Sequence, residues 1–248
     1  MILPAVTEVE SLRETIKLLL RTSAGDISEL IFVVCDRTTP ETLAACYEVQ
    51  RSSGKKTIIH MQARPFLGNA IREAIPLATA RHVVIMATDL ETDPATFPDL
   101  VGEAKRRPEA VITASRWLRR RSFQGYGAVR VPLNYSFQFM ARVLYGTSLS
   151  DLTFGYRLFP LALLQSINWE GQRHDFLLET ILKPVRLQVP VIEVPTRWVP
   201  RTEGASQNSI KFQLEYVAMA LRCRFAKPDR ILRHPAPPAI GAARHVQR

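Results

Sequence analysis

The chain has 248 residues, of which 46% are hydrophobic, and it carries a formal net charge of +10. That length and apolar content suffice for the core of one α/β domain of ordinary size, so a second domain is not required. The charge favours an anionic partner. Nucleic acid, a phosphorylated substrate and acidic lipid headgroups all satisfy it.

Three cysteines occur, at Cys35, Cys46 and Cys223. An odd number without C-x-x-C spacing indicates neither a disulfide framework nor a structural zinc site, and it favours a reducing cytoplasm. Charged residues interrupt the first segment too early for a signal peptide, and no run approaches the ~20 apolar residues that cross a bilayer. We therefore expect a cytoplasmic protein whose contact with a membrane is peripheral.

Apolar strands and amphipathic helices alternate through the first half of the chain. Apolar, β-branched runs predict strands at 30–35, 57–61, 83–86 and 110–113. Apolar residues at three- and four-residue spacing predict helices at about 8–21, 40–52, 67–79 and 96–107. Because only Met1–Leu3 precede Pro4, the first strand is either clipped or begins upstream of residue 1. The alternation indicates an α/β fold with a mostly parallel sheet covered on both faces.

Polar residues follow these strands at the edge where parallel sheets bind ligands. Asp36 follows the second strand, Gly68 and Asn69 the third, and Ser115 and Arg116 the fifth. We therefore expect the functional site at this edge.

The segment after the fourth strand, MATDLETDP, carries a sharper chemical signal. Asp89 and Glu91 alternate as strand side chains do, so both can point to one side and share Mg²⁺ or Mn²⁺. The alternative is an acidic turn that caps the helix beginning near Pro94, where Asp is common. On these residues alone the two interpretations are equally supported.

The pattern changes after Arg116. A basic loop, 119–121, leads to a helix at about 132–145 whose aromatic residues and Met make it a candidate membrane face, and another apolar helix follows at about 209–225. From residue 227 the chain is rich in Pro and Arg, which is typical of a disordered tail. We place one domain at 1–226 and a tail at 227–248.

Motifs in a fixed order extend to about residue 225. They comprise Pro4-Ala5 with Glu8, VVCDRTT around Asp36, LGNAIR around Gly68 and Asn69, the acidic segment, ASRW at Arg116, SDLTFGYRLF around Asp151, and EVPTRW leading to Arg201. This series resembles glycosyltransferase family 2 and, within it, the dolichol-phosphate mannose synthase branch. The block around Asp151 is the most specific match. The resemblance implies a GT-A type, Rossmann-like single domain.

The resemblance also implies a nucleotide-sugar donor and a divalent cation. It assigns donor binding to Pro4, Ala5, Glu8, Asp36, Gly68, Asn69, Asp89, Glu91 and Arg201, and Mg²⁺ or Mn²⁺ to Asp89 and Glu91. Several residues depart from the family pattern: Val6 and Thr7 replace a Tyr and an Asn, and Cys35 and Ala87 each replace an Asp. Glu91 stands where the family has Gln and restores the negative charge, so we expect the cation to be retained.

The acceptor side is implied by three residues in the family's positions. Ser115 and Arg116 match a Gly-Ser-Arg-Tyr element, and Arg130 falls where the lipid-phosphate branch has an arginine before its membrane-facing helices. A guanidinium suits a phosphate because it donates two parallel hydrogen bonds. Asp151 is expected near the donor sugar, and its pairing with Arg157 is the structural alternative.

The implied reaction is inverting transfer of a sugar from GDP-mannose or a UDP-hexose to a polyprenyl or dolichyl phosphate, at the cytoplasmic face of a membrane. Asp89, Asp151 and Arg201 are the predicted catalytic residues, with Arg201 neutralising the departing diphosphate. A hydroxyl acceptor would instead need a base such as Asp151 or Glu179. Two further alternatives are a non-catalytic nucleotide-sugar-binding protein, because of Ala87, and a nucleic-acid-binding module, for which we find no motif and which we do not expect.

Overall fold

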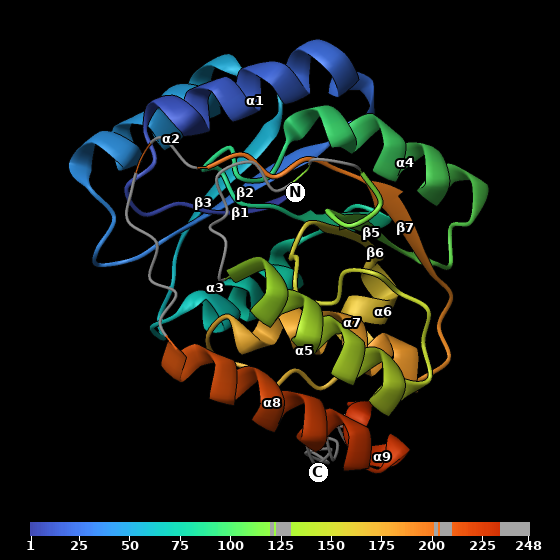
Figure 1. Ribbon diagram of the computed structural model, residues 1–248. Coiled ribbons are helices and arrows are strands. Elements are labelled where there is room, and N and C mark those ends of the chain that lie inside the picture. Colours follow the sequence, from blue (N-terminus) through green and yellow to red (C-terminus); the bar gives the residue numbers. More distant parts are fainter. Residues whose placement is uncertain (120–121, 123–129, 201–202, 204–209, 234–248) are drawn as a thin grey trace, which may run out of the picture.

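A seven-stranded, mostly parallel sheet forms the centre of the molecule (Figure 1). In this computed structural model the strand order is β3-β2-β1-β4-β6-β5-β7, and β6 runs antiparallel to both of its neighbours. The strands are β1 (Ile2–Pro4), β2 (Glu29–Val34), β3 (Lys56–Met61), β4 (His82–Ile85), β5 (Val111–Ser115), β6 (Arg157–Pro160) and β7 (Val191–Pro195). The structure describes residues 1–119, 122, 130–200, 203 and 210–233, without the side chains of residues 130 and 210–213.

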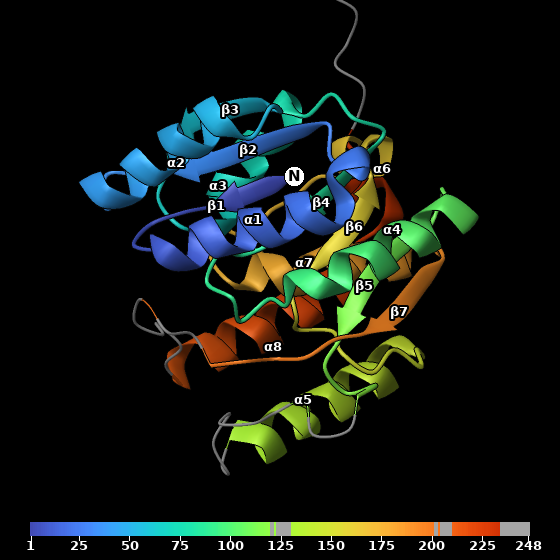
Figure 2. The ribbon, with the colours of Figure 1, turned by 90° about the horizontal axis from the view of Figure 1, so that it is seen from above.

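Helices cover both faces of the sheet (Figures 1 and 2). One face carries α1 (Glu10–Ser23), α2 (Pro40–Ser52) and α4 (Phe97–Arg106). The other carries α3 (Leu67–Ala74), α5 (Arg130–Tyr145), α6 (Leu161–Ser166), α7 (Asp175–Arg186) and α8 (Ile210–Phe225). A buried apolar cluster lies on each side, so removal of apolar surface from water holds both layers to the sheet. The predicted α/β class is confirmed.

Local chemistry explains where the predicted helices begin and end. Helix α2 has the predicted range because the Thr39 side chain accepts a hydrogen bond from the Thr42 amide at its start, and Pro40 occupies the first turn. Helix α1 begins at Glu10, two residues later than predicted. Helix α3 ends at Ala74 and continues as a 3₁₀ turn containing Pro76, which has no amide hydrogen to donate.

The second half contains elements that the sequence patterns did not predict. Strand β6 runs in the opposite direction to β4 and β5, so the residues before Arg157 lie at the carboxyl edge of the parallel strands. Most residues of helix α7 are buried. Because of this arrangement, the loop that precedes β6 joins the same edge as the ends of β1, β2, β4, β5 and β7.

The chain continues to pack after α8. Helix α9 (Pro228–Ile231) follows, with Ile231 almost fully buried and its carbonyl accepting a hydrogen bond from the Asn168 amide at 2.8 Å. Residues 227–233, expected to be part of a disordered tail, are thus ordered, and residues 234–248 lie outside the described part. Within the described residues, no helix combines the length and apolarity needed to span a bilayer.

Candidate active site

The ends of β1, β2 and β4 are joined into one surface. The Thr38 hydroxyl donates to the Ala5 carbonyl at 2.9 Å and accepts from the Cys35 amide at 2.9 Å. The Thr88 hydroxyl donates to the Pro4 carbonyl at 3.4 Å. The structure therefore brings the predicted donor residues Pro4 and Ala5 beside the loops that carry Asp36 and Asp89. Thr38 was not singled out from the sequence, although its position two residues before the start of α2 is typical of loop-closing hydroxyls.

Glu8 and Asp36 flank this surface in different ways. The Glu8 carboxylate turns back on its own loop and accepts from the amides of Val6 and Thr7, at 2.7 and 2.9 Å. These bonds compete with helix formation at Glu8 and place the start of α1 at Glu10. Asp36, by contrast, is solvent-exposed at the end of β2.

Gly68 and Asn69 lie at the start of α3, where Gly68 contacts the backbone of residues 171–172. The Gly68 amide donates to the Gln172 carbonyl at 2.7 Å, and a Cβ atom at Gly68 would lie 2.5 Å from the Gly171 carbonyl oxygen. The Asn69 side chain is buried and donates to the Pro65 carbonyl at 2.7 Å. The glycine is thus required by the approach of the 171–172 loop, a contact that the sequence did not reveal.

The acidic segment is a turn and not an extension of β4. The strand ends at Ile85, and Leu90 has a φ of 60°, so Asp89 and Glu91 do not alternate as strand side chains. Instead, the Glu91 amide donates to the buried Asp89 carboxylate at 3.1 Å. Asp93 caps the 3₁₀ turn Pro94–Thr96 by accepting from the Ala95 amide. The prediction that Asp89 and Glu91 alternate as strand side chains is therefore wrong, and Asp93 is the residue that caps the following turn.

The same turn limits how a divalent cation would be held. Among the described residues, no three His, Cys, Asp or Glu side chains gather in a way that could hold a metal ion. Asp89 and Glu91 supply at most two carboxylates from neighbouring positions. This fits the manner in which Mg²⁺ is usually bound, through one or two carboxylates plus substrate phosphates and water, and does not fit an all-protein cage.

A buried ion pair lies at the end of β5. Arg116 is 5% exposed and Asp151 is fully buried. The guanidinium donates to both carboxylate oxygens, Nε to Oδ2 at 2.7 Å and Nη2 to Oδ1 at 2.9 Å. Gln138, from α5, and the amides of Thr153 and Phe154 also donate to the Asp151 carboxylate. Asp151 therefore ties β5, the loop before β6 and α5 together.

The environment of Asp151 keeps it ionised. Burial by itself would raise the pKa of this carboxyl, but the Arg116 charge and the hydrogen bonds outweigh burial and lower the pKa below its ordinary value. The partner is Arg116 and not Arg157, whose guanidinium donates to Thr113 Oγ1 at 3.0 Å and to the Leu152 carbonyl at 2.9 Å. Burial lowers the pKa of Arg157 to about 10.

Ser115 is also engaged within the loop. Its hydroxyl lies 2.6 Å from the Ser150 hydroxyl, and the Glu193 carboxylate, from β7, accepts from the amides of Ser150 and Asp151. Sequence reasoning missed this role of Glu193. The signal available was an acidic residue in the middle of an otherwise apolar strand, which requires a partner.

Three further candidates are Arg201, Arg130 and Glu179. Arg201 lies outside the described residues, and so does the side chain of Arg130, whose backbone begins α5. Glu179, the alternative base, is fully buried on α7, where it is paired with Lys183 at 2.6 Å and accepts from the Gly171 amide. The roles predicted for Asp89, Asp151 and Arg201 stay predictions.

Comparison with known proteins places this geometry in a family. The sequence profile described as Glycosyl transferase family 2 matches residues 1–167. The chain belongs to glycosyltransferase family 2. This member is 25% identical over 215 residues to an undecaprenyl-phosphate mannosyltransferase of Micrococcus luteus, covering 84% of this chain and 86% of the relative. It is thus a glycosyltransferase.

Solved structures share the fold of this family member. A glucosyl-3-phosphoglycerate synthase from Mycobacterium tuberculosis, in complex with Mn²⁺, UDP and phosphoglyceric acid, has a TM-score of 0.68 at 16% identity, covering 91% of this chain and 78% of that one. The same enzyme with Mg²⁺ and UDP has a TM-score of 0.66 at 18% identity, covering 90% and 77%. The GT-A type fold implied by the sequence resemblance is confirmed.

Proposed function

We propose that this glycosyltransferase transfers a hexose from GDP-mannose or a UDP-sugar to a polyprenyl phosphate, with inversion at the anomeric carbon. The donor would lie along the ends of β1, β2 and β4, where Pro4, Ala5, Asp36 and Asp89 come together. Support for the acceptor comes from the Micrococcus luteus relative, an undecaprenyl-phosphate mannosyltransferase.

The choice of a phosphate acceptor rests on Asp151 and Glu179, the two carboxylates that could act as a general base for a hydroxyl acceptor. Asp151 is fully buried in its pair with Arg116, and Glu179 is fully buried in its pair with Lys183. A general base must reach the proton it removes and must bind it well enough to take it, and the lowered pKa of Asp151 opposes this. A phosphate acceptor is already an anion at neutral pH and needs no base.

Asp89 and Glu91 would hold Mg²⁺ or Mn²⁺ against the donor diphosphate, as the Mn²⁺ and Mg²⁺ complexes of glucosyl-3-phosphoglycerate synthase suggest. The cation would supply positive charge to the leaving diphosphate. Arg201 would add a second positive group there.

The acceptor side would be ordered by Ser115, Arg116 and Arg130. Because Arg116 is bound to Asp151, we propose that Arg116 positions this loop and that Arg130 contacts the phosphate.

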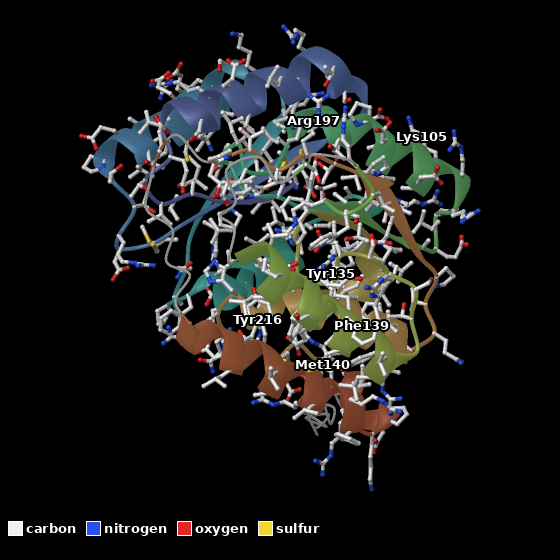
Figure 3. The ribbon with its side chains drawn as sticks, viewed as in Figure 1. Lys105, Tyr135, Phe139, Met140, Arg197 and Tyr216 are labelled. Atoms are coloured by element: carbon white, nitrogen blue, oxygen red, sulfur yellow. The ribbon has the colours of Figure 1, made fainter. Side chains whose placement is uncertain are left out.

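A polyprenyl-phosphate acceptor lies in a membrane, so the enzyme needs a surface that binds lipid. Helices α5 and α8 are candidates for this surface. On α5, the apolar residues Leu133, Phe139 and Val143 are between 47% and 69% exposed. Figure 3 shows Phe139 and Met140 on this helix beside α8. On α8, Leu214 and Phe225 are more than 70% exposed, and the exposed Arg222 lies on the same helix. Apolar and basic side chains on one surface are suited to an anionic membrane interface.

The test is turnover with defined components. The protein is incubated with undecaprenyl or dolichyl phosphate, Mg²⁺ or Mn²⁺, and a panel of UDP- and GDP-sugars, and released nucleoside diphosphate is measured. We expect release that needs both lipid phosphate and cation and that disappears in Asp89→Ala. Asp99→Ala, which removes an exposed carboxylate from the first turn of α4, is the matched control and should retain activity.

Other outcomes would redirect the proposal. Release with a sugar or glycerol hydroxyl acceptor, but not with lipid phosphate, would overturn the acceptor class. Donor binding in calorimetry without release for any acceptor would favour the non-catalytic nucleotide-sugar binder that Ala87 allows.

A further inference from the structure

The segment that leaves β7 crosses the carboxyl edge of the sheet. Figure 1 shows it in orange, passing from β7 across the central strands toward α1 and α2. Its beginning is fixed at two points: the Thr196 amide donates to the Ser115 carbonyl at 3.0 Å, and the Thr196 hydroxyl lies 2.7 Å from that of Thr96 in a buried contact. Thr96 follows the acidic turn, so this segment is joined to the loop that carries Asp89.

The far end of the segment is fixed by Glu203. Its carboxylate accepts hydrogen bonds from the amides of Val9, Glu10 and Ser11, at 2.9, 3.2 and 3.2 Å. It also accepts from the Ser11 hydroxyl at 2.8 Å. A side chain 194 residues away in sequence from Val9 thus occupies the start of α1.

Helix α1 needs such a partner. The residue at its N-cap is Val9, which has no side-chain acceptor, so the first amides of the helix are not capped locally. A carboxylate at a helix N-terminus is favoured by both the free amides and the helix dipole. Burial raises the pKa of Glu203, but the bonds from the Val9 amide and Ser11 lower it overall, so the carboxylate is ionised at neutral pH.

The anchoring point is next to the donor side. The first turn of α1 follows Glu8, whose carboxylate closes the loop between β1 and α1. A link between Glu203 and this turn therefore connects the segment after β7 to the loop that carries Pro4 and Ala5. Thr196 at one end and Glu203 at the other attach the segment to opposite sides of the proposed donor surface.

We infer that Glu203 is a positioning residue: its carboxylate latches the segment that leaves β7 onto the first turn of α1 and so holds Thr196–Pro200 across the donor-binding edge. This inference rests on the proposed function for the identity of the donor. Glu203 acts through α1 and Thr196–Pro200 and need not touch the donor itself.

The experiment compares Glu203→Ala with a matched control. Glu10→Ala removes a carboxylate from the same helical turn, but that carboxylate is exposed and pairs with Arg13 on its own helix. For both variants we measure donor KM and kcat, melting temperature, UDP and GDP affinity by calorimetry, and the rate of tryptic cleavage after the exposed Arg197, identified by mass spectrometry.

We expect Glu203→Ala to raise donor KM by roughly tenfold, the scale of a lost set of charge-assisted hydrogen bonds, with a smaller change in kcat. Cleavage after Arg197 should accelerate several-fold, whereas Glu10→Ala should match the wild type in both readouts. Glu203→Gln keeps the shape but loses the charge and should fall between.

Unchanged KM and unchanged cleavage in a folded Glu203→Ala would overturn the latch. An equal effect of Glu10→Ala would also overturn it, because the effect would then belong to the charge of α1. If the wild type transfers no sugar from any donor, the proposed function fails separately. Diphosphate affinity and cleavage after Arg197 then still decide the latch.

Discussion

Arg116 and Asp151 form a buried ion pair that holds several elements of the candidate site together. Removing one partner leaves the other charge buried and uncompensated, which is far more costly than removing both. We expect Asp151→Ala to lower the free energy of unfolding by about 3–5 kcal/mol, measured by urea denaturation at pH 7. The fully buried Asp151 carboxylate makes this cost hard to relieve by hydration.

The double variant Arg116→Met with Asp151→Leu provides the control. It removes both charges and keeps similar volume, so it should be clearly more stable than Asp151→Ala alone. If the two have equal stability, the pair is not desolvated in the way the structure shows.

Glu29, the first residue of β2, makes the stability of the protein depend on pH. Burial raises the pKa of this carboxyl, but hydrogen bonds from the Thr79 amide at 2.6 Å and the Ala80 amide at 3.1 Å outweigh burial. The pKa falls from 4.5 to about 2. A lowered folded-state pKa stabilises the protein above the unfolded-state value, and this contribution disappears as the pH falls through the folded-state value.

Glu29→Gln should therefore destabilise the protein at neutral pH, by ~3 kcal/mol if the whole pKa shift is expressed. The difference in unfolding free energy between wild type and variant should be constant above about pH 5 and should shrink between pH 4.5 and 2. Urea titrations at pH 7, 4 and 3 measure it. A difference that stays constant down to pH 3 would show that the carboxylate is not held by these bonds.

At the scale of elements, Gly68 sets how closely α3 approaches the loop before α7. A Cβ atom at this position would lie 2.5 Å from the Gly171 oxygen and 2.7 Å from the Gln172 carbonyl carbon, and both are backbone atoms that cannot turn away. Gly68→Ala should therefore destabilise by about 1–3 kcal/mol and weaken nucleotide binding, since α3 must shift.

Gly102→Ala is the matched control for that change. Gly102 lies within α4, and a Cβ atom there would meet nothing within 4 Å. The substitution should be neutral or stabilising by about 0.5–1 kcal/mol, because alanine favours helix. Thermal melts of both variants, with UDP and GDP titrations, separate the packing effect from the helix effect.

The elements that were predicted correctly are those whose signals are local. Helix α2 has its cap, its proline and its apolar spacing within one short segment, so its range could be read directly. The range of strand β7 could not be read in this way, because its residues are half-buried and Glu193 interrupts its apolar pattern. The Glu193 side chain accepts a hydrogen bond from the Asp151 amide, in a loop that is distant in sequence. The direction of β6 depends on its pairing with β4 and β5, which no local pattern encodes.

The features of the candidate site can likewise be separated into those that the sequence predicted and those that it did not. The strand ends that carry Pro4, Asp36 and Asp89 followed from the alternation of strands and helices alone, because parallel strands end at one edge. The conformation of the acidic turn did not, because the positive φ of Leu90 is invisible in the sequence. Nor did the partner of Asp151: the sequence suggested Arg157, whereas the folded chain pairs Asp151 with Arg116.

At the scale of the whole molecule, the two faces of the sheet differ in what they expose. The face covered by α1, α2 and α4 shows mainly charged side chains, with Tyr47 as an exposed aromatic residue on α2. The opposite face carries α5 and α8, packed side by side through Phe137 and Tyr216, whose rings lie 5.9 Å apart. Both helices therefore expose their apolar residues on the same side of the sheet.

This asymmetry predicts oriented binding to lipid. Replacing the exposed Phe139 and Val143 of α5 by serine should weaken co-sedimentation with vesicles containing anionic lipid by roughly tenfold or more, since each buried apolar side chain contributes about 1.5–3 kcal/mol. Tyr47→Ser, on the opposite face, should bind as the wild type does. Binding should also fall as salt rises from low to moderate concentration, because basic residues such as Arg222 contribute through screened attraction. Wild-type protein that ignores anionic vesicles at moderate salt, or an effect of Tyr47→Ser equal to that of the α5 variant, would remove the basis for placing the acceptor at a membrane surface.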